Sequence, residues 1–314
     1  MARITSRHSP FAAAVCCILS LFSIIRAQLI GCEAVGCPQS DGTTSSCPIG
    51  NFTAQAIGTA NFTSAISSDP LTWTVAFKSE ISLTNTSADV LERSYYLGSP
   101  ASLDLATIDV KGCALIFKDV VNRREFSPTE AGTCPSLLGA SCVSDLMSQA
   151  NKTLLEILDT EDPTFICSKL AVQLRDNAPS SCSLTDDNLW GAISVQDITG
   201  PSLLGPIAVD ATCNPTSRDG YHLISIDSQQ STTLPISASV NAFAWGVTPV
   251  VSVFYSSTLP STFEAPEISL SCLKPVAQDS IVVVPLESTA TNLISIPWTL
   301  TAIATSLIFA LIST

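Results

Sequence analysis

Two different periods of apolar and polar residues run through the central part of the chain. Over residues 71–83 apolar residues occupy alternate positions and polar residues fill most of those between, a period of two that predicts a strand with one buried face. The same alternation returns over residues 234–242 and predicts a second strand. Shorter apolar runs, separated by Ser, Thr, Gly and Pro, predict further strands at 113–117, 192–195, 223–226 and 250–255.

The period changes to about four between residues 137 and 175, which is the spacing of a helix with one buried face. Residues 159–163 interrupt this pattern, so it predicts two helices, and Pro179 ends the second one. The predicted fold class is therefore α+β: a disulfide-bonded, strand-rich ectodomain with an inserted helical pair at about 137–175.

The N-terminal residues have the features of a secretory signal peptide. Arg3 and Arg7 precede an uncharged run at 11–25, which is too short to span a bilayer as a helix. Residues 25–27 then resemble a signal-peptidase site. We expect residues 1–27 to be removed and the mature chain to begin near Gln28.

The C-terminal residues have the order of a glycosylphosphatidylinositol (GPI) attachment signal. Small residues at 288–290 are followed by a less apolar spacer and then by a strongly apolar tail at 300–312. This order predicts that a GPI lipid is attached at Ser288 and replaces residues 289–314.

A transmembrane anchor is the alternative interpretation, because residues 293–312 are just long enough to span a bilayer. Two observations favour the GPI signal instead. No Lys or Arg follows the apolar stretch, whereas single-pass anchors have basic cytoplasmic flanks. Pro297 would also interrupt the helix.

The remaining ectodomain, residues 28–288, is strongly acidic. It keeps 11 basic residues against 27 acidic ones, a net charge of −16. Such a surface repels nucleic acid, so we expect no nucleic-acid partner. The expected partners are the outer leaflet of the membrane, through the lipid anchor, and cell-wall glycans.

Cysteine usage indicates an oxidising compartment. Ten of the twelve cysteines lie beyond the signal peptide, and an even number in an exported chain predicts disulfides. No CxxC pair occurs and only one histidine follows residue 27, so we expect neither a zinc site nor another cofactor. The predicted disulfide cysteines are Cys32, Cys37, Cys47, Cys113, Cys134, Cys142, Cys167, Cys182, Cys213 and Cys272.

Four sequons predict N-linked glycans on the surface of the exported protein. Three of them lie within 35 residues, so we expect a sugar-covered face on the N-terminal part of the ectodomain. A fifth, at Asn214, is excluded by Pro215. The predicted glycosylation sites are Asn51, Asn61, Asn85 and Asn151.

No motif in the sequence specifies a catalytic reaction. His222 is the only imidazole base of the mature chain, and Ser141 is the nearest approach to a GxSxG nucleophile, without the second glycine. A turn or surface histidine is the favoured interpretation. The acid pairs Asp186–Asp187 and Glu264/Glu267 could serve glycoside hydrolysis, but they fit a turn and edge charges equally well. We therefore expect no enzyme.

Aromatic residues are the candidates for glycan contact. Trp73 lies on the apolar side of its predicted strand, which favours core packing. Phe243 and Trp245 share the polar side of theirs, so they are the predicted exposed aromatic pair and the candidate glycan contacts.

Several segments carry a resemblance to known proteins: residues 94–100, residues 112–117, the stretch from 132 to 143, and the apolar tail. With them the chain, over about residues 90–200, resembles uncharacterised secreted or GPI-anchored, cysteine-containing proteins of filamentous ascomycete fungi. The resemblance implies a fungal cell surface or cell wall and carries no activity.

The predicted function is that of a non-enzymatic, GPI-anchored cell-surface or cell-wall glycoprotein with a structural or surface-interaction role. The alternatives are a glycan-binding module and a wall-polysaccharide hydrolase that uses a carboxylate pair. The predicted localisation is the secretory pathway to the outer leaflet of the plasma membrane or the cell wall.

Overall fold

The fold is described from a computed structural model. The described residues are 28–30, 47–80, 89–122, 124–160, 165–182, 190–207, 213–216, 220–233, 237–256, 266–276 and 281–283. The predicted signal peptide and GPI signal with Ser288 lie outside them, as do Cys32, Cys37 and Asn85.

Two antiparallel four-stranded sheets form the centre of the molecule. The first, here the β5 sheet, has the order β4-β5-β6-β9, and the second, the β10 sheet, has the order β11-β10-β7-β8. The strands of the β5 sheet are β4 (Ala56–Ser64), β5 (Ser67–Glu80), β6 (Asp89–Pro100) and β9 (Tyr221–Thr233). Those of the β10 sheet are β7 (Lys111–Phe117), β8 (Ile193–Asp197), β10 (Thr248–Tyr255) and β11 (Glu267–Leu273).

The two sheets face each other across a shared core. Trp73, Val75 and Leu97 of the β5 sheet pack there with Ile116 and Val250 of the β10 sheet. Burial of these side chains is the main force that holds the sheets together.

One pair of sheet edges is also joined, between β4 and β11. Ile57 forms an isolated β-bridge with Val276, just beyond β11. The Glu267 carboxylate accepts hydrogen bonds from Ser64 Oγ at 2.6 Å and from the Ala65 amide at 3.0 Å. The two sheets therefore form a sandwich that is closed along this side.

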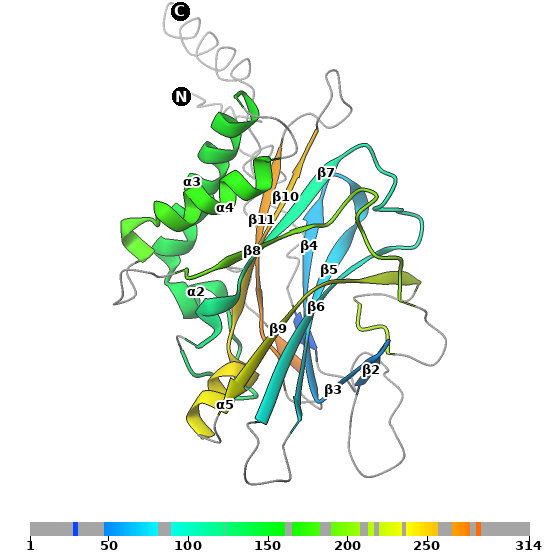
Figure 1. The fold of residues 1–314 in the computed structure, drawn as a ribbon, viewed down its shortest axis with the longest axis vertical. Helices are drawn as coiled ribbons and strands as arrows, with labels where there is room; N and C mark the ends of the chain where they lie inside the picture. Colours follow the sequence, from blue (N-terminus) through cyan, green and yellow to red (C-terminus); the bar gives the residue numbers. More distant parts are fainter. Residues whose placement is uncertain are drawn as a thin grey trace, which may run out of the picture.

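Helices cover the outer face of the β10 sheet (Figure 1). They are α2 (Cys134–Leu138), α3 (Ala140–Leu158) and α4 (Ile166–Asp176), with the 3₁₀ turns η2 (Lys118–Asn122) and η3 (Ser180–Cys182). Leu146, Ala150 and Leu154 form the buried stripe of α3, at the spacing of four that predicted this helix. The predicted inserted helical pair and the α+β class are confirmed.

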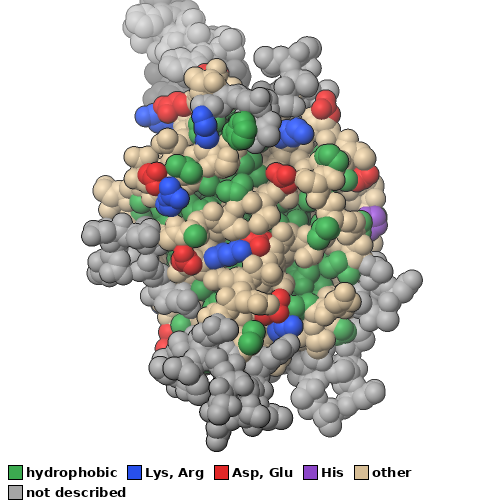
Figure 2. Space-filling model, viewed as in Figure 1, with side chains coloured by type: hydrophobic (Ala, Val, Ile, Leu, Met, Phe, Trp, Pro, Cys, Tyr) green, Lys and Arg blue, Asp and Glu red, His purple; other side chains and the backbone are tan. Residues whose placement is uncertain are grey.

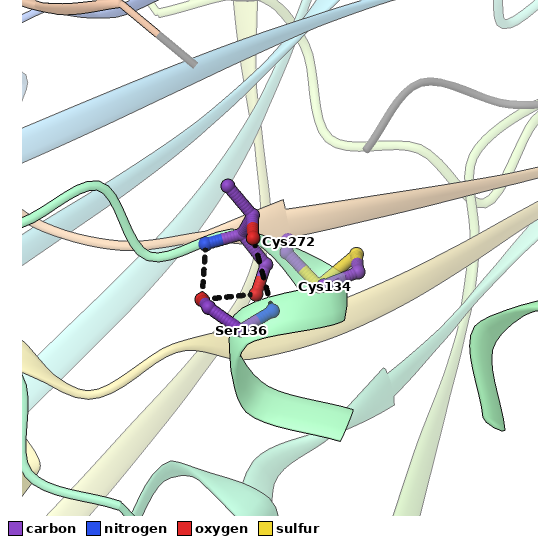
Figure 3. Close-up of a disulfide and its surroundings, with 4 residues drawn as sticks. Cys134, Ser136 and Cys272 are labelled. Carbon is purple, nitrogen blue, oxygen red and sulfur yellow. Dashed lines mark hydrogen bonds between the residues drawn. A yellow bond between two sulfur atoms is a disulfide. The ribbon is translucent and has the colours of Figure 1, made fainter. Parts of the chain in front are cut away.

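The start of this helical layer is fixed by a capping box. The Thr133 hydroxyl accepts a hydrogen bond from the Ser136 amide at 3.0 Å, and Ser136 Oγ accepts one from the Thr133 amide at 2.8 Å. Gly139, with a φ of 85° that favours glycine, then separates α2 from α3. Figure 3 shows the same turn beside the Cys134–Cys272 disulfide.

Strand β5 differs from the prediction because both of its faces are covered. Thr72 and Thr74 lie on the side expected to face solvent, yet both are buried. Thr74 Oγ1 donates to the Pro215 carbonyl at 2.6 Å, and Ala76 packs with the hairpin β2 (Cys47–Ile49) and β3 (Phe52–Ala54). A further pair, β1 (Gln28–Ile30) with β12 (Ile281–Val283), completes the strands.

The predicted strand at 234–242 is wrong over its described part, which is helical. Helix α5 (Ser237–Trp245) lies at one end of the sandwich (Figure 1). Its apolar residues Val240, Phe243 and Ala244 have the i, i+3, i+4 spacing of a helix and pack with Phe77. Alternation of apolar residues with Ser and Asn had predicted a strand, but several of these residues are small and also fit a helix, and the spacing of Val240, Phe243 and Ala244 decides the outcome.

Candidate functional site

Three disulfides join distant segments. Cys113–Cys167 links β7 to α4, Cys134–Cys272 links α2 to β11, and Cys142–Cys182 links α3 to η3. Cys47 and Cys213 are disulfide-bonded as well. The predicted disulfide bonding is confirmed for these eight cysteines, while Cys32 and Cys37 lie outside the described residues.

The described sequon asparagines differ in exposure. Asn51 is exposed at the turn between β2 and β3. Asn61 on β4 is half-buried, and its Oδ1 accepts a hydrogen bond from Thr72 Oγ1 at 2.9 Å. Asn151 is half-buried on α3. Glycosylation of these residues stays a prediction, and Asn51 is the most accessible of the three.

The candidate nucleophile and base are not brought together. Ser141 is exposed on α3 in the helical layer, whereas His222 is half-buried on β9 in the opposite sheet. Ser99 lies opposite His222 in the β6–β9 register, but its buried hydroxyl has no hydrogen-bond partner in the described part of the chain. Among the described residues, no serine–histidine pair is therefore assembled around His222.

The candidate acid pairs do not form a site within the described residues. Asp186, Asp187 and Glu264 lie outside them. Glu267 is held by Ser64 and Ala65 between β4 and β11, so its carboxylate serves the joint of the two sheets.

Of the three tryptophans in the described part of the chain, two are buried in the core and one is partly exposed. Trp73 is buried and donates its indole N–H to Ser252 Oγ at 2.9 Å, across the two sheets. Trp190 is buried against Phe117, with ring centroids 5.0 Å apart. Trp245 is half-buried at the end of α5.

The predicted exposed pair of Phe243 and Trp245 is wrong for Phe243. Only 1% of Phe243 is exposed, because the helix turns its side chain onto the end of the sandwich. Its ring meets Phe77 edge-on, at a centroid distance of 6.4 Å. Trp245 is thus the single candidate glycan contact that keeps an accessible surface.

Trp245 lies in a cavity of about 460 Å³ between α5 and the segment that follows η2. Cavities of this size accept small ligands. The described lining residues are Glu125, Phe126, Ser127, Pro128, Asn241 and Trp245.

The apolar part of this Trp245 pocket is held by its surroundings. Trp245 rests on Phe77, with ring centroids 6.4 Å apart. Phe126 is buried, and the Arg124 guanidinium lies 4.7 Å from its ring centroid. The Glu130 amide donates to the Ser127 carbonyl at 3.2 Å, which closes a turn around Pro128. The pocket is therefore formed before any ligand arrives.

The polar part of the Trp245 pocket comes from two exposed side chains. Within the described residues, neither the Glu125 carboxylate nor the Asn241 amide makes a hydrogen bond or an ion pair. Together they offer a carboxylate acceptor and an amide that both donates and accepts. An aromatic face beside such groups suits a ligand with one apolar face and several hydroxyls.

A second cavity, of about 520 Å³, lies between α3 and α4. Its described lining residues are Thr153, Glu156, Ile157, Thr160, Ser168, Lys169, Val172 and Gln173. None of them is aromatic, and Thr153 belongs to the Asn151 sequon, so a glycan there would lie beside this groove. The Trp245 pocket is the better candidate site.

The surface around these features has mixed charge. On the face drawn in Figure 2 acidic and basic side chains stand among uncharged ones and form no one-signed patch. The described residues contain no group of three or more His, Cys, Asp or Glu suited to a metal ion. No described helix is both long and apolar enough to cross a membrane.

Comparison of the chain with protein-family models, with curated proteins and with solved structures found no match.

Proposed function

We propose that this chain is a non-enzymatic surface glycoprotein that binds glycans in the Trp245 pocket. The observation that carries the proposal is that Trp245, Glu125 and Asn241 line one open pocket, and that neither polar side chain has a partner among the described residues. The aromatic face would stack on the C–H face of a sugar ring, while the carboxylate and amide bind its hydroxyls.

The same pocket supports binding rather than hydrolysis. Glycosidases of both stereochemical classes use two carboxyl groups on either side of the scissile bond. The described lining of the Trp245 pocket has one, from Glu125. A ligand held there meets an acceptor for its hydroxyls but no acid–base pair.

The surface context remains part of the proposal. Disulfides and an exposed sequon at Asn51 fit an exported protein. Attachment of a GPI lipid at Ser288 would hold the ectodomain at the outer leaflet or in a fungal wall. Phosphatidylinositol-specific phospholipase C should then release the native protein from membranes, and a mature protein that keeps its apolar tail in mass spectrometry would refute the anchor.

Glycan binding is tested on an array with the native glycosylated ectodomain. Trp245→Ala and Asn241→Ala should each reduce the signal at least tenfold, because the first removes the stacking face and the second a hydroxyl partner. Phe165→Ala is the matched control, since Phe165 is 56% exposed on the helical layer, away from the pocket. An array signal that survives both pocket variants, or no signal from the folded wild type, would refute this function.

A further inference from the structure

Two cationic side chains are completely buried at the end of the sandwich near α5. Arg93, on β6, and Lys274, directly after β11, are each 0% exposed. Burial of one charge costs several kcal/mol even after relaxation, and two charges of the same sign also repel each other. A folded protein that keeps such a pair needs something to offset that cost.

Both cations flank the same short segment, from Gly246 to Thr248. Arg93 Nη2 donates to the Gly246 carbonyl at 3.0 Å, and Tyr95, on the same face of β6, has its hydroxyl 3.2 Å from Thr248 Oγ1. On the other side, the stem of Lys274 lies beside Val247, since a β-carbon at Gly132 would meet both of these side chains. Burial, together with the nearby Arg93 charge, lowers the pKa of Lys274 to about 8.

The two cations have fewer partners than donors. Arg93 Nε and Nη1 are buried without any hydrogen-bond partner in the described structure, although a guanidinium carries five N–H groups. Lys274 Nζ donates to the uncharged Pro275 carbonyl at 3.2 Å. No described carboxylate forms an ion pair with either of them.

The carboxylate that raises the pKa of Lys274 already has other partners. Glu130 raises the pKa of Lys274, but its Oε1 lies 3.4 Å from Arg124 Nη2 and its Oε2 accepts from the Ser127 amide. Within the described residues, the buried pair therefore has a net positive charge and unused N–H donors.

We propose that Arg93 and Lys274 together bind a small inorganic anion, such as chloride, inside the sandwich. The ion accepts from the unused N–H donors of Arg93 and from the Lys274 ammonium, and its charge offsets theirs. A buried water could satisfy some of these donors but would leave both charges uncompensated.

The anion would act as a structural ligand and not as a substrate. Because Arg93 also binds the carbonyl that follows Trp245, occupancy would stabilise the end of α5 and with it one wall of the Trp245 pocket. The inference does not depend on glycan binding, and each can fail without the other.

The first test measures thermal unfolding of the native ectodomain below pH 8, at fixed ionic strength, while chloride replaces gluconate. Above its dissociation constant, each tenfold rise in chloride should lower the unfolding equilibrium constant about tenfold. Lys274→Met should lose this response and still fold, since Met fills similar volume without charge. Lys152→Met removes an exposed cation of α3 and should keep the response of the wild type.

The second test locates the ion directly. Crystals of the wild-type protein soaked in bromide should show anomalous density between Arg93 and Lys274. Equal stability of the wild type in chloride and gluconate, a chloride response that persists in Lys274→Met, or the absence of bromide at this place would each overturn the proposal.

Discussion

The two faces of the β10 sheet are covered in different ways. Its outer face meets the helical layer through an almost wholly apolar cluster, and all three described disulfides with known partners contribute to that cluster. Its inner face meets the β5 sheet, where Trp73 bonds to Ser252, Tyr95 bonds to Thr248, and no described disulfide crosses.

The difference reflects how each layer is attached to the sheet. The sheets contact each other over long strands and share a joined edge, so hydrophobic area alone can hold them together and some polar groups can be buried at a cost. The helices form an insertion between β7 and β8, with apolar side chains such as Phe165 and Val172 still exposed. The insertion has no strand paired with the sheet, so its attachment combines an apolar cluster with covalent links.

The largest effect on the helical layer should come from removing the Cys134–Cys272 disulfide, which closes a longer loop than the other two disulfides of that layer. Cys134 and Cys272 are 138 residues apart, so replacing both with Ala should lower the free energy of unfolding by about 3–5 kcal/mol. Replacing Cys142 and Cys182, which are 40 residues apart, should cost about 1 kcal/mol less. Urea unfolding of both double variants checks the order, and a larger loss from the shorter loop would contradict the loop-entropy explanation.

The next largest loss of stability should come from weakening the apolar contact between α3 and the β10 sheet. Leu154 of α3 is fully buried against the sheet, and Leu154→Ala should lower the free energy of unfolding by about 3 kcal/mol through lost burial and a cavity. The neighbouring Leu155 is 46% exposed, so Leu155→Ala should change it by less than about 0.5 kcal/mol. Similar losses in the two variants would mean that α3 is rotated from the orientation described.

The sequence predicted the helices, which have one buried and one exposed face, and the strands that appear as short apolar runs. The helical pair has an exposed face, and its period of four is visible in Leu146 and Leu154. The short apolar runs that became β7, β8, β9 and β10 were also predicted. Strand β6 was not, because it is buried on both faces while it contains Glu92, Arg93 and Gly98, which give neither alternation nor an apolar run.

The candidate site could be predicted only in part. Trp245 was chosen from composition and its local pattern, but its neighbours Glu125 and Ser127 come from a segment about 120 residues earlier, which no local pattern connects to it. The prediction that Phe243 is exposed was wrong because a strand was predicted where the chain forms helix α5. The buried state of Arg93 and Lys274 could not be predicted, since charged residues are almost always exposed.

A smaller effect, an increase in the free energy of unfolding, is expected from removing the buried charge of Lys274. In buffer without chloride, Lys274→Met should raise the free energy of unfolding by about 1–2 kcal/mol, because it removes a buried, unpaired charge. Chemical unfolding of the two proteins at neutral pH checks this. A clear loss of stability would mean that the ammonium is compensated in a way the described contacts do not include.

In the same chloride-free buffer, Lys274 should also give the wild type a characteristic pH dependence. The pKa of Lys274 is about 8 when folded and near 10.5 when unfolded, so between these values the unfolded state binds more protons and stability rises with pH. The rise should be clear from about pH 8 to 10. Above that, the raised pKa values of buried Tyr95 and Tyr96 act in the opposite direction. Lys274→Met should show no rise in this window, and a persisting rise would assign it to another group.

The smallest effect should come from one hydroxyl between the sheets. Thr248→Val keeps the shape of the side chain but removes the partner of Tyr95, whose hydroxyl retains Gln229 Oε1 at 3.3 Å, so the loss should be about 1 kcal/mol. The double variant Thr248→Val with Tyr95→Phe should lose less free energy of unfolding than the sum of the two single variants. Each single variant leaves one hydroxyl without its partner, whereas the double variant removes both hydroxyls. Urea unfolding of the four proteins gives the coupling energy. Strict additivity would show that the hydrogen bond between Tyr95 and Thr248 does not contribute to stability.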